Sequence, residues 1–151
     1  MNYRFDENTN RVFLEGSITE HDDIVPLSEK LPAEAVLDVS GITRINSSGV
    51  RQWIHFVKSV PETVQISLEG CPLVVINQIN MIANFLGASR IKVKSLVVPF
   101  ACVTCGNSAE ELREAERLAK EGIVGSPSCP ECGSEMEPDV LQSEYLAFLN
   151  R

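Results

Sequence analysis

Two cysteine pairs with identical spacing constrain the C-terminal part of this 151-residue chain. Cys102 and Cys105 form one Cys-x-x-Cys pair, and Cys129 and Cys132 form a second pair after 23 intervening residues. A two-residue separation lets both sulfurs of a pair reach one ion from a tight turn, and the glycine that follows each pair permits the necessary backbone bend. The four cysteines therefore predict a tetrahedral metal site.

Four sulfur ligands leave no open position for a bound water, so we expect the site to be structural and to hold zinc. The arrangement resembles a zinc ribbon, and iron is the alternative metal. Cys129-Pro130-Glu131-Cys132 alone would also fit a redox dithiol, but that interpretation leaves the first pair unexplained. Cys71, between Gly70 and Pro72, is expected to be a packed residue without a chemical role.

The charge of the chain is concentrated in its C-terminal part. Residues 1–100 carry 11 acidic and 9 basic residues, a net charge of −2, whereas residues 101–151 carry 10 acidic and 4 basic residues, a net charge of −6. An acidic module opposes close approach to a phosphate backbone, so we expect no nucleic-acid partner. No apolar run approaches the roughly 18 to 20 residues of a membrane helix, so we expect no membrane insertion and a cytoplasmic protein.

Residues 1–100 show alternating strand and helix patterns. Hydrophobic periodicity, turn residues and prolines predict a hairpin, then helix, strand, helix, strand, helix and strand. The expected ranges are strands at 2–6 and 11–18, a helix near 20–31, a strand at 36–39, a helix from the serines near 47 to 58, a strand at 64–68, a helix from 72 to 86 and a strand at 91–98. This order predicts an α/β fold with a mixed sheet and crossover helices.

The C-terminal part is expected to contain two further helices. One is a charged helix over 108–121, between the cysteine pairs, and the other runs from 139 to 149. One stripe of the second helix carries apolar side chains that need apolar surface to cover, either within the chain or on a partner. They are Leu141, Tyr145, Phe148 and Leu149. With little or no linker after residue 100, we expect this module to pack against the first domain.

Two adjacent serines mark the junction between the strand at 36–39 and the next helix. The string is Asn46-Ser47-Ser48-Gly49-Val50, and Trp53 falls on the apolar face of the helix that follows, where it is expected in the core. A serine at a helix start can cap free backbone N–H groups. The same donors and the helix dipole would stabilise a phosphate on its hydroxyl. The junction is therefore suited to a phosphorylation switch.

This string and the order of elements around it resemble the STAS family, the domain of bacterial anti-sigma factor antagonists and of sulfate transporter tails. The resemblance covers residues 1–100 as a STAS-like regulatory domain, followed by the zinc-ribbon-like module at 101–151. It implies that Ser47 is phosphorylated, with Ser48 as the fallback acceptor, and that the partner is an anti-sigma factor kinase. Asn46 departs from the family, which has an aspartate there. Arg44 and Arg51 flank the serines and complete the expected partner-binding surface with Asn46, Ser47, Ser48 and Gly49.

Two other functions fit the sequence. Because STAS-like domains also occur in transport machinery and larger signalling assemblies, the chain could be an unswitched scaffold or subunit. The cysteine pairs alone would fit a thiol redox protein. A serine enzyme is not expected, because no Gly-x-Ser-x-Gly turn is present and neither His21 nor His55 is suitably placed as a base.

Overall fold

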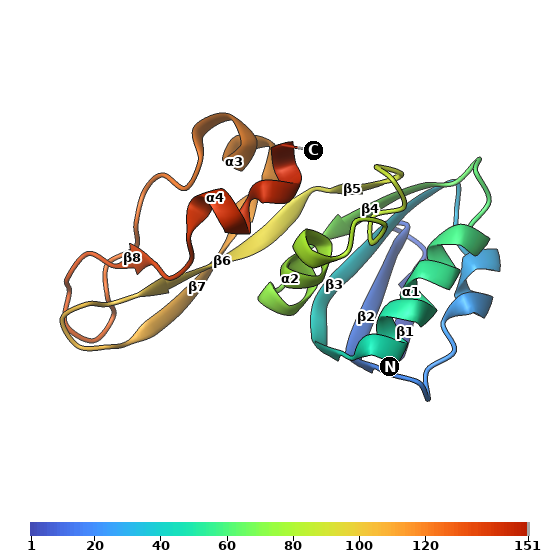
Figure 1. Ribbon diagram of the computed structural model, residues 1–151, viewed down its shortest axis with the longest axis horizontal. Helices are drawn as coiled ribbons and strands as arrows, with labels where there is room; N and C mark the ends of the chain where they lie inside the picture. The colour runs from blue at the N-terminus through green and yellow to red at the C-terminus, as the bar shows by residue number, and fades with distance from the viewer. Residues whose placement is uncertain (151) are drawn as a thin grey trace.

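The computed structural model describes residues 1–150 and contains two β-sheets joined by a continuous chain (Figure 1). The larger sheet has five strands in the order β1-β2-β3-β4-β5, and the smaller has three in the order β7-β6-β8. The strands are β1 (Asn2–Asp6), β2 (Arg11–Ile18), β3 (Glu34–Ile45), β4 (Gln65–Glu69), β5 (Ile91–Val93), β6 (Ser95–Ala101), β7 (Ser108–Glu114) and β8 (Glu137–Pro138). The fold is mixed α/β, as the sequence predicts.

The helices are α1 (Ser47–Ser59), α2 (Leu73–Met81), α3 (Ala115–Glu121) and α4 (Gln142–Tyr145), with 3₁₀ helices η1 (Val25–Glu29) and η2 (Ala147–Asn150). Three helical elements, η1, α1 and α2, connect the parallel strands of the larger sheet, and the other helices lie in the C-terminal part. β1 and β2 pair antiparallel as the expected hairpin, whereas β2, β3, β4 and β5 pair in parallel. The mixed sheet is therefore confirmed.

The core of this part lies between the five-stranded sheet and one layer of helices. In Figure 1, η1, α1 and α2 all lie on the same face of the sheet. Val12 and Leu14 of β2 are buried at alternate positions, as a strand with one covered face requires. Trp53 of α1 is fully buried, its ring stacks on Phe85 with 5.3 Å between centroids, and its Nε1 donates to the Phe85 carbonyl at 2.8 Å. The expected core position of Trp53 is confirmed.

The helix expected near 20–31 is wrong apart from one short turn. Only η1 forms there, beginning beside Pro26. The Asp22 carboxylate accepts hydrogen bonds from the backbone N–H and the hydroxyl of Thr19, at 2.7 and 3.0 Å, and pairs with the N-terminal ammonium of Met1. Asp22 therefore closes a turn that holds the N-terminus instead of starting a helix.

The strand expected at 91–98 is two strands in different sheets. β5 ends at Val93 and β6 begins at Ser95, while the N–H of Lys94 between them donates to the Leu68 carbonyl at 2.8 Å. β6 then leaves the larger sheet and pairs with β7 and β8. Residues 91–98 carry no glycine, proline or turn pattern at Lys94 and Ser95, so the sequence concealed this change of sheet.

The charged helix expected over 108–121 is half strand and half helix. Residues 108–114 form β7, which pairs with β6 along its whole length, and only residues 115–121 form α3. Exposed and half-buried side chains alternate along β7, the period of a strand. Pairing with β6 thus overrides the helical propensity of this charged segment.

The C-terminal segment packs against α2 and β6. The helix expected over 139–149 is shorter, because only α4 and η2 form, and within the stripe Tyr145 and Phe148 are buried whereas Leu141 is exposed. The Tyr145 hydroxyl donates to the Val97 carbonyl at 2.6 Å. The Asn80 amide donates to the Tyr145 carbonyl at 2.9 Å and accepts from the Phe148 N–H at 3.1 Å. The Tyr145 side chain and the backbone of Tyr145 and Phe148 therefore hold the C-terminal segment against β6 and α2.

Arg90 binds the C-terminal end of α1 and yields a stability prediction. Its guanidinium donates to the carbonyls of Val57 at 3.0 Å and Val60 at 2.6 Å, and also to that of Pro61. Arg90→Met leaves these partly buried carbonyls without a donor, and we expect the unfolding free energy in urea to fall by about 1 to 3 kcal/mol. Arg51→Met, at an exposed position of α1, is the control and should change it by less than about 0.5 kcal/mol. Equal urea midpoints for the two variants would contradict this role.

Candidate functional site

The first cysteine pair lies in the turn between β6 and β7. The Cys102 N–H donates to the Asn107 carbonyl at 2.8 Å, and the Gly106 N–H donates back to the Cys102 carbonyl at 2.8 Å. Gly106 has φ of +77°, a left-handed conformation that glycine adopts without steric cost. The β6-β7 hairpin thus holds both sulfurs of this pair on one side of a tight turn.

The second pair repeats this geometry. The Cys129 N–H donates to the Ser134 carbonyl at 2.7 Å, the Gly133 N–H donates to the Cys129 carbonyl at 2.8 Å, and Gly133 has φ of +78°. An antiparallel β-bridge pairs Ser128 with Glu135, the two residues that flank the turn. The repeated Cys-x-x-Cys-Gly pattern therefore encodes the same turn twice.

The two turns bring all four cysteine sulfurs together. These sulfurs lie within 4.8 Å of one another, with Cys102 to Cys132 at 3.4 Å and Cys105 to Cys129 at 3.5 Å. Four sulfurs bound to one zinc at about 2.3 Å stand about 3.8 Å apart in a tetrahedron. The four thiols, which include the buried Cys102 and Cys129, are thus close enough to hold a metal ion.

Hydrogen bonds within the second turn favour thiolates. The hydroxyl and backbone N–H of Ser134 lower the pKa of the Cys132 thiol to about 6, and the backbone N–H of Cys132 lowers that of Cys129. At Cys105 the Asn107 backbone N–H also lowers the pKa, but proton sharing with the other sulfurs, Cys129 first, raises it to about 12. A bound cation would replace these shared protons, so metal affinity should fall as the pH decreases.

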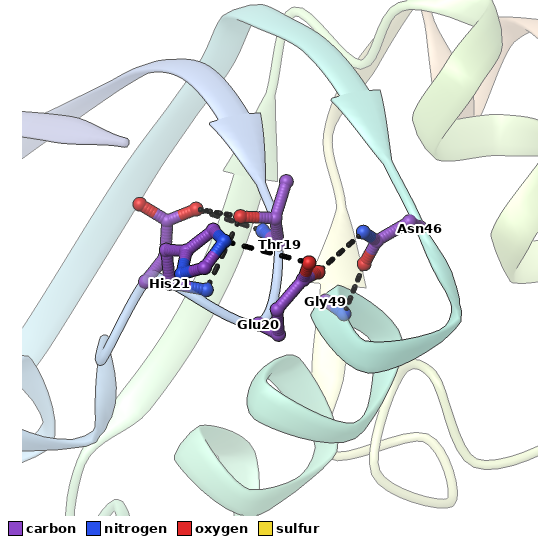
Figure 2. Close-up of polar contacts among 6 residues, drawn as sticks. Thr19, Glu20, His21, Asn46 and Gly49 are labelled. Carbon is purple, nitrogen blue, oxygen red and sulfur yellow. Dashed lines mark hydrogen bonds and ion pairs between the residues drawn. The ribbon is translucent and has the colours of Figure 1, made fainter.

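A second candidate site lies where α1 begins (Figure 2). Asn46 has an extended backbone directly after β3, and its side-chain oxygen accepts from the Gly49 N–H at 2.7 Å. Asn46 is therefore the N-cap of α1, and the prediction that a serine caps this helix is wrong. The reason is that β3 extends to Ile45, farther than the expected 36–39, which places Asn46 at the cap and Ser47 at the first helical position.

Gly49 lets the start of α1 approach the end of β2. A Cβ atom at Gly49 would stand 1.9 Å from the carbonyl oxygen of Ile18, a distance that no side chain tolerates. The same Ile18 carbonyl accepts from the Asn46 N–H at 3.3 Å. The glycine of the serine string is thus required by packing.

The structure places the expected partner-binding residues at this end of α1. Ser47, Arg44 and Arg51 are exposed and Ser48 is half-buried. Within residues 1–150, no hydrogen bond engages the Ser47 hydroxyl and no ion pair engages either arginine. Because Asn46 caps the helix, the Ser47 hydroxyl is available to solvent.

Glu20 belongs to this site, although no sequence motif pointed to it. The Asn46 amide donates to the Glu20 carboxylate at 2.8 Å, and Figure 2 shows the Asn46 side chain facing both Glu20 and Gly49. The backbone N–H of Glu20 and this amide, with the nearby charges of His21 and Arg44, lower the pKa of the Glu20 carboxyl. Glu20 is 26 residues from Asn46 in the chain, so only the fold brings the two together.

The comparisons with protein-family models, curated proteins and solved structures found no match. Among the described residues, 1–150, no helix has the length and apolar character needed to span a membrane.

Replacing Asn46 and Ser47 separately tests which residue caps α1. Asn46→Ala removes the acceptor of the Gly49 N–H, and we expect it to lower the unfolding free energy by about 1 kcal/mol. Ser47→Ala, at the next position, should change the unfolding free energy by less than about 0.5 kcal/mol, as is usual for a surface substitution. A larger loss for Ser47→Ala, measured by urea denaturation, would mean that the serine is the cap.

Proposed function

We propose that this chain is a regulatory protein-binding module of the STAS type, which binds a partner protein through the surface around Ser47. The supporting observation is the exposed Ser47 hydroxyl at the start of a 13-residue helix whose cap is provided by another residue. In this proposal residues 1–100 form the STAS-like domain and residues 101–151 the zinc-ribbon-like module. Following the family resemblance, the partner is an anti-sigma factor kinase.

Phosphorylation of Ser47 would switch this surface through charge. The first N–H groups of a helix have no intrahelical acceptor, and at α1 the cap uses only that of Gly49. A phosphoryl group on Ser47 would therefore meet free donors and the positive end of the helix dipole, so the modified chain stays folded. The added charge of about −2 would face the partner and weaken binding.

Glu20 offers a physical account of the departure from the family at position 46. An aspartate there would place a second carboxylate against Glu20, whereas the Asn46 amide caps with its oxygen and donates to Glu20 with its nitrogen. In our proposal Glu20 thus supplies the negative charge that the family carries at the cap. Ser47 then keeps an acidic neighbour.

The unswitched scaffold is the second candidate function, and Asn46 is the observation that favours it. The nitrogen and the oxygen of the Asn46 side chain both have hydrogen-bond partners, although position 46 has no carboxylate. The hydrogen bonds at the start of α1 therefore need no phosphate on Ser47. A stable partner that is not a kinase, bound equally by wild-type chain and Ser47→Asp, would favour this function over the switch.

We further propose that the four cysteines hold a structural zinc ion. Tetrahedral spacing and an all-sulfur donor set support zinc, and iron is the competing occupant. Zinc would neutralise part of the thiolate charge and hold the two turns together. Because four sulfurs leave no position for substrate or water, the role of the ion would be structural. A role in the cytoplasm, where thiols stay reduced, is consistent with this site.

The switch predicts opposite behaviour for two substitutions of Ser47. With the chain immobilised in extract of its own host, wild type and Ser47→Ala should capture an ATP-binding kinase, identified by mass spectrometry. Ser47→Asp should lose it, because negative charge enters the contact surface. Ser126→Asp, exposed in the C-terminal module, is the charge-matched control and should bind like wild type. Equal capture by all four chains would exclude the switch.

The metal site predicts stoichiometric zinc. Purified wild-type chain should contain one zinc per molecule by elemental analysis, and Cys129→Ser should lose the metal together with order in residues 101–150, seen by amide hydrogen exchange. Cys71→Ser, which changes a buried cysteine outside the cluster, is the control and should keep its zinc. Metal-free chain whose cysteine pairs form intramolecular disulfides in air and return to thiols when dithiothreitol is added would favour the redox function.

A further inference from the structure

An apolar groove lies between α2 and α4, away from the start of α1. Its volume is about 510 Å³, and its lining includes Asn77, Met81, Val140, Leu141 and Tyr145. Two of these large apolar side chains project into solvent, with 68% of Met81 and 66% of Leu141 exposed. Such exposure of two neighbouring apolar side chains is typical of a contact surface.

The walls of the groove are held by the contacts that fix the C-terminal segment. Asn80 of α2 binds the backbone of Tyr145 and Phe148, and the Tyr145 hydroxyl binds β6 at Val97. Met81 follows Asn80 at the end of α2, and Leu141 precedes α4. The groove therefore has a fixed shape with two exposed apolar side chains, and methionine adapts easily to different partners.

The C-terminal segment that forms one wall of the groove is acidic. Residues 121–150 contain six acidic residues and no Lys, Arg or His. The six are Glu121, Glu131, Glu135, Glu137, Asp139 and Glu144. Glu144 lines the groove and the exposed Asp139 directly precedes Val140. A partner must therefore bring apolar side chains together with positive charge.

We propose that this groove binds a basic amphipathic helix of a partner protein. The choice of a helix follows from the walls, which are α2 and the segment that leads into α4. An added strand has no place on β6, because one edge pairs with β7 and the other is occupied by Cys71, Asp139 and β8. Leucines on one face of the partner helix would contact Met81 and Leu141, while lysines or arginines beside them would lie near Glu144 and Asp139.

Two synthetic helical peptides of about 18 residues provide the probe, long enough to form several turns. Both carry leucine at i, i+3, i+4 and i+7, and one has lysine and the other glutamate at the remaining positions. In fluorescence anisotropy at low salt, wild-type chain should bind the lysine peptide, and bind it more weakly as salt is added. Equal binding of the glutamate peptide would overturn the proposed partner chemistry.

Two aspartate substitutions separate the groove from general attraction between acidic protein and basic peptide. Met81→Asp and Leu141→Asp should each weaken binding about tenfold, as expected for loss of a central apolar contact. Each adds negative charge, which alone would strengthen the attraction. Leu112→Asp, at a 63% exposed position of β7, is the charge-matched control and should bind like wild type. Equal effects of all three substitutions would overturn the groove as the binding site.

Two further controls define what the groove recognises. Glu144→Gln should weaken binding more than Glu116→Gln on α3, which lowers the charge equally. Ser47→Asp should leave peptide binding unchanged, so the test is independent of the proposed switch. Circular dichroism confirms that each variant is folded. If wild-type chain self-associates through the groove in sedimentation and Leu141→Asp does not, a second copy is the occupant and the basic helix is excluded.

Discussion

The close approach of α1 to the end of β2 determines how this chain presents its candidate switch. The Ile18 carbonyl accepts the Asn46 N–H at the point where Gly49 leaves no side chain between helix and strand. Asn46 can then cap the helix and bind Glu20 with the same side chain. A larger residue at position 49 would separate helix from strand and remove the geometry that leaves Ser47 exposed.

The sequence was most informative where a local pattern carries its own geometry. The hairpin of β1 and β2, helix α1 and the two cysteine turns follow from periodicity, turn residues and the repeated Cys-x-x-Cys-Gly string. The core position of Trp53 follows from its place on the apolar face of α1. Each of these features is determined mainly by residues that lie close together in the sequence.

Where distant partners decide the structure, the sequence was misleading. The segment 108–114 has helical residues but pairs with β6, and the single strand expected from Ile91 to Val98 divides between two sheets at Lys94. The sequence pattern favours a serine as the cap of α1, whereas the true cap, Asn46, follows from the length of β3, which depends on pairing with its neighbours. Glu20 could not be found at all, because its contact with Asn46 exists only after the first parallel crossover has formed.

The two candidate surfaces differ in electrostatic character, which fits a chain that contacts proteins. The start of α1 combines exposed arginines with Glu20, whereas the C-terminal segment is uniformly acidic and includes the apolar groove. Phosphate occupancy at Ser47, measured by peptide mass spectrometry in partner-bound and free chain from the native host, tests the central claim most directly. The account predicts phosphate at Ser47 in the free fraction and an unmodified serine in the bound fraction. Unmodified Ser47 in both fractions, or equal phosphate in both, would contradict it.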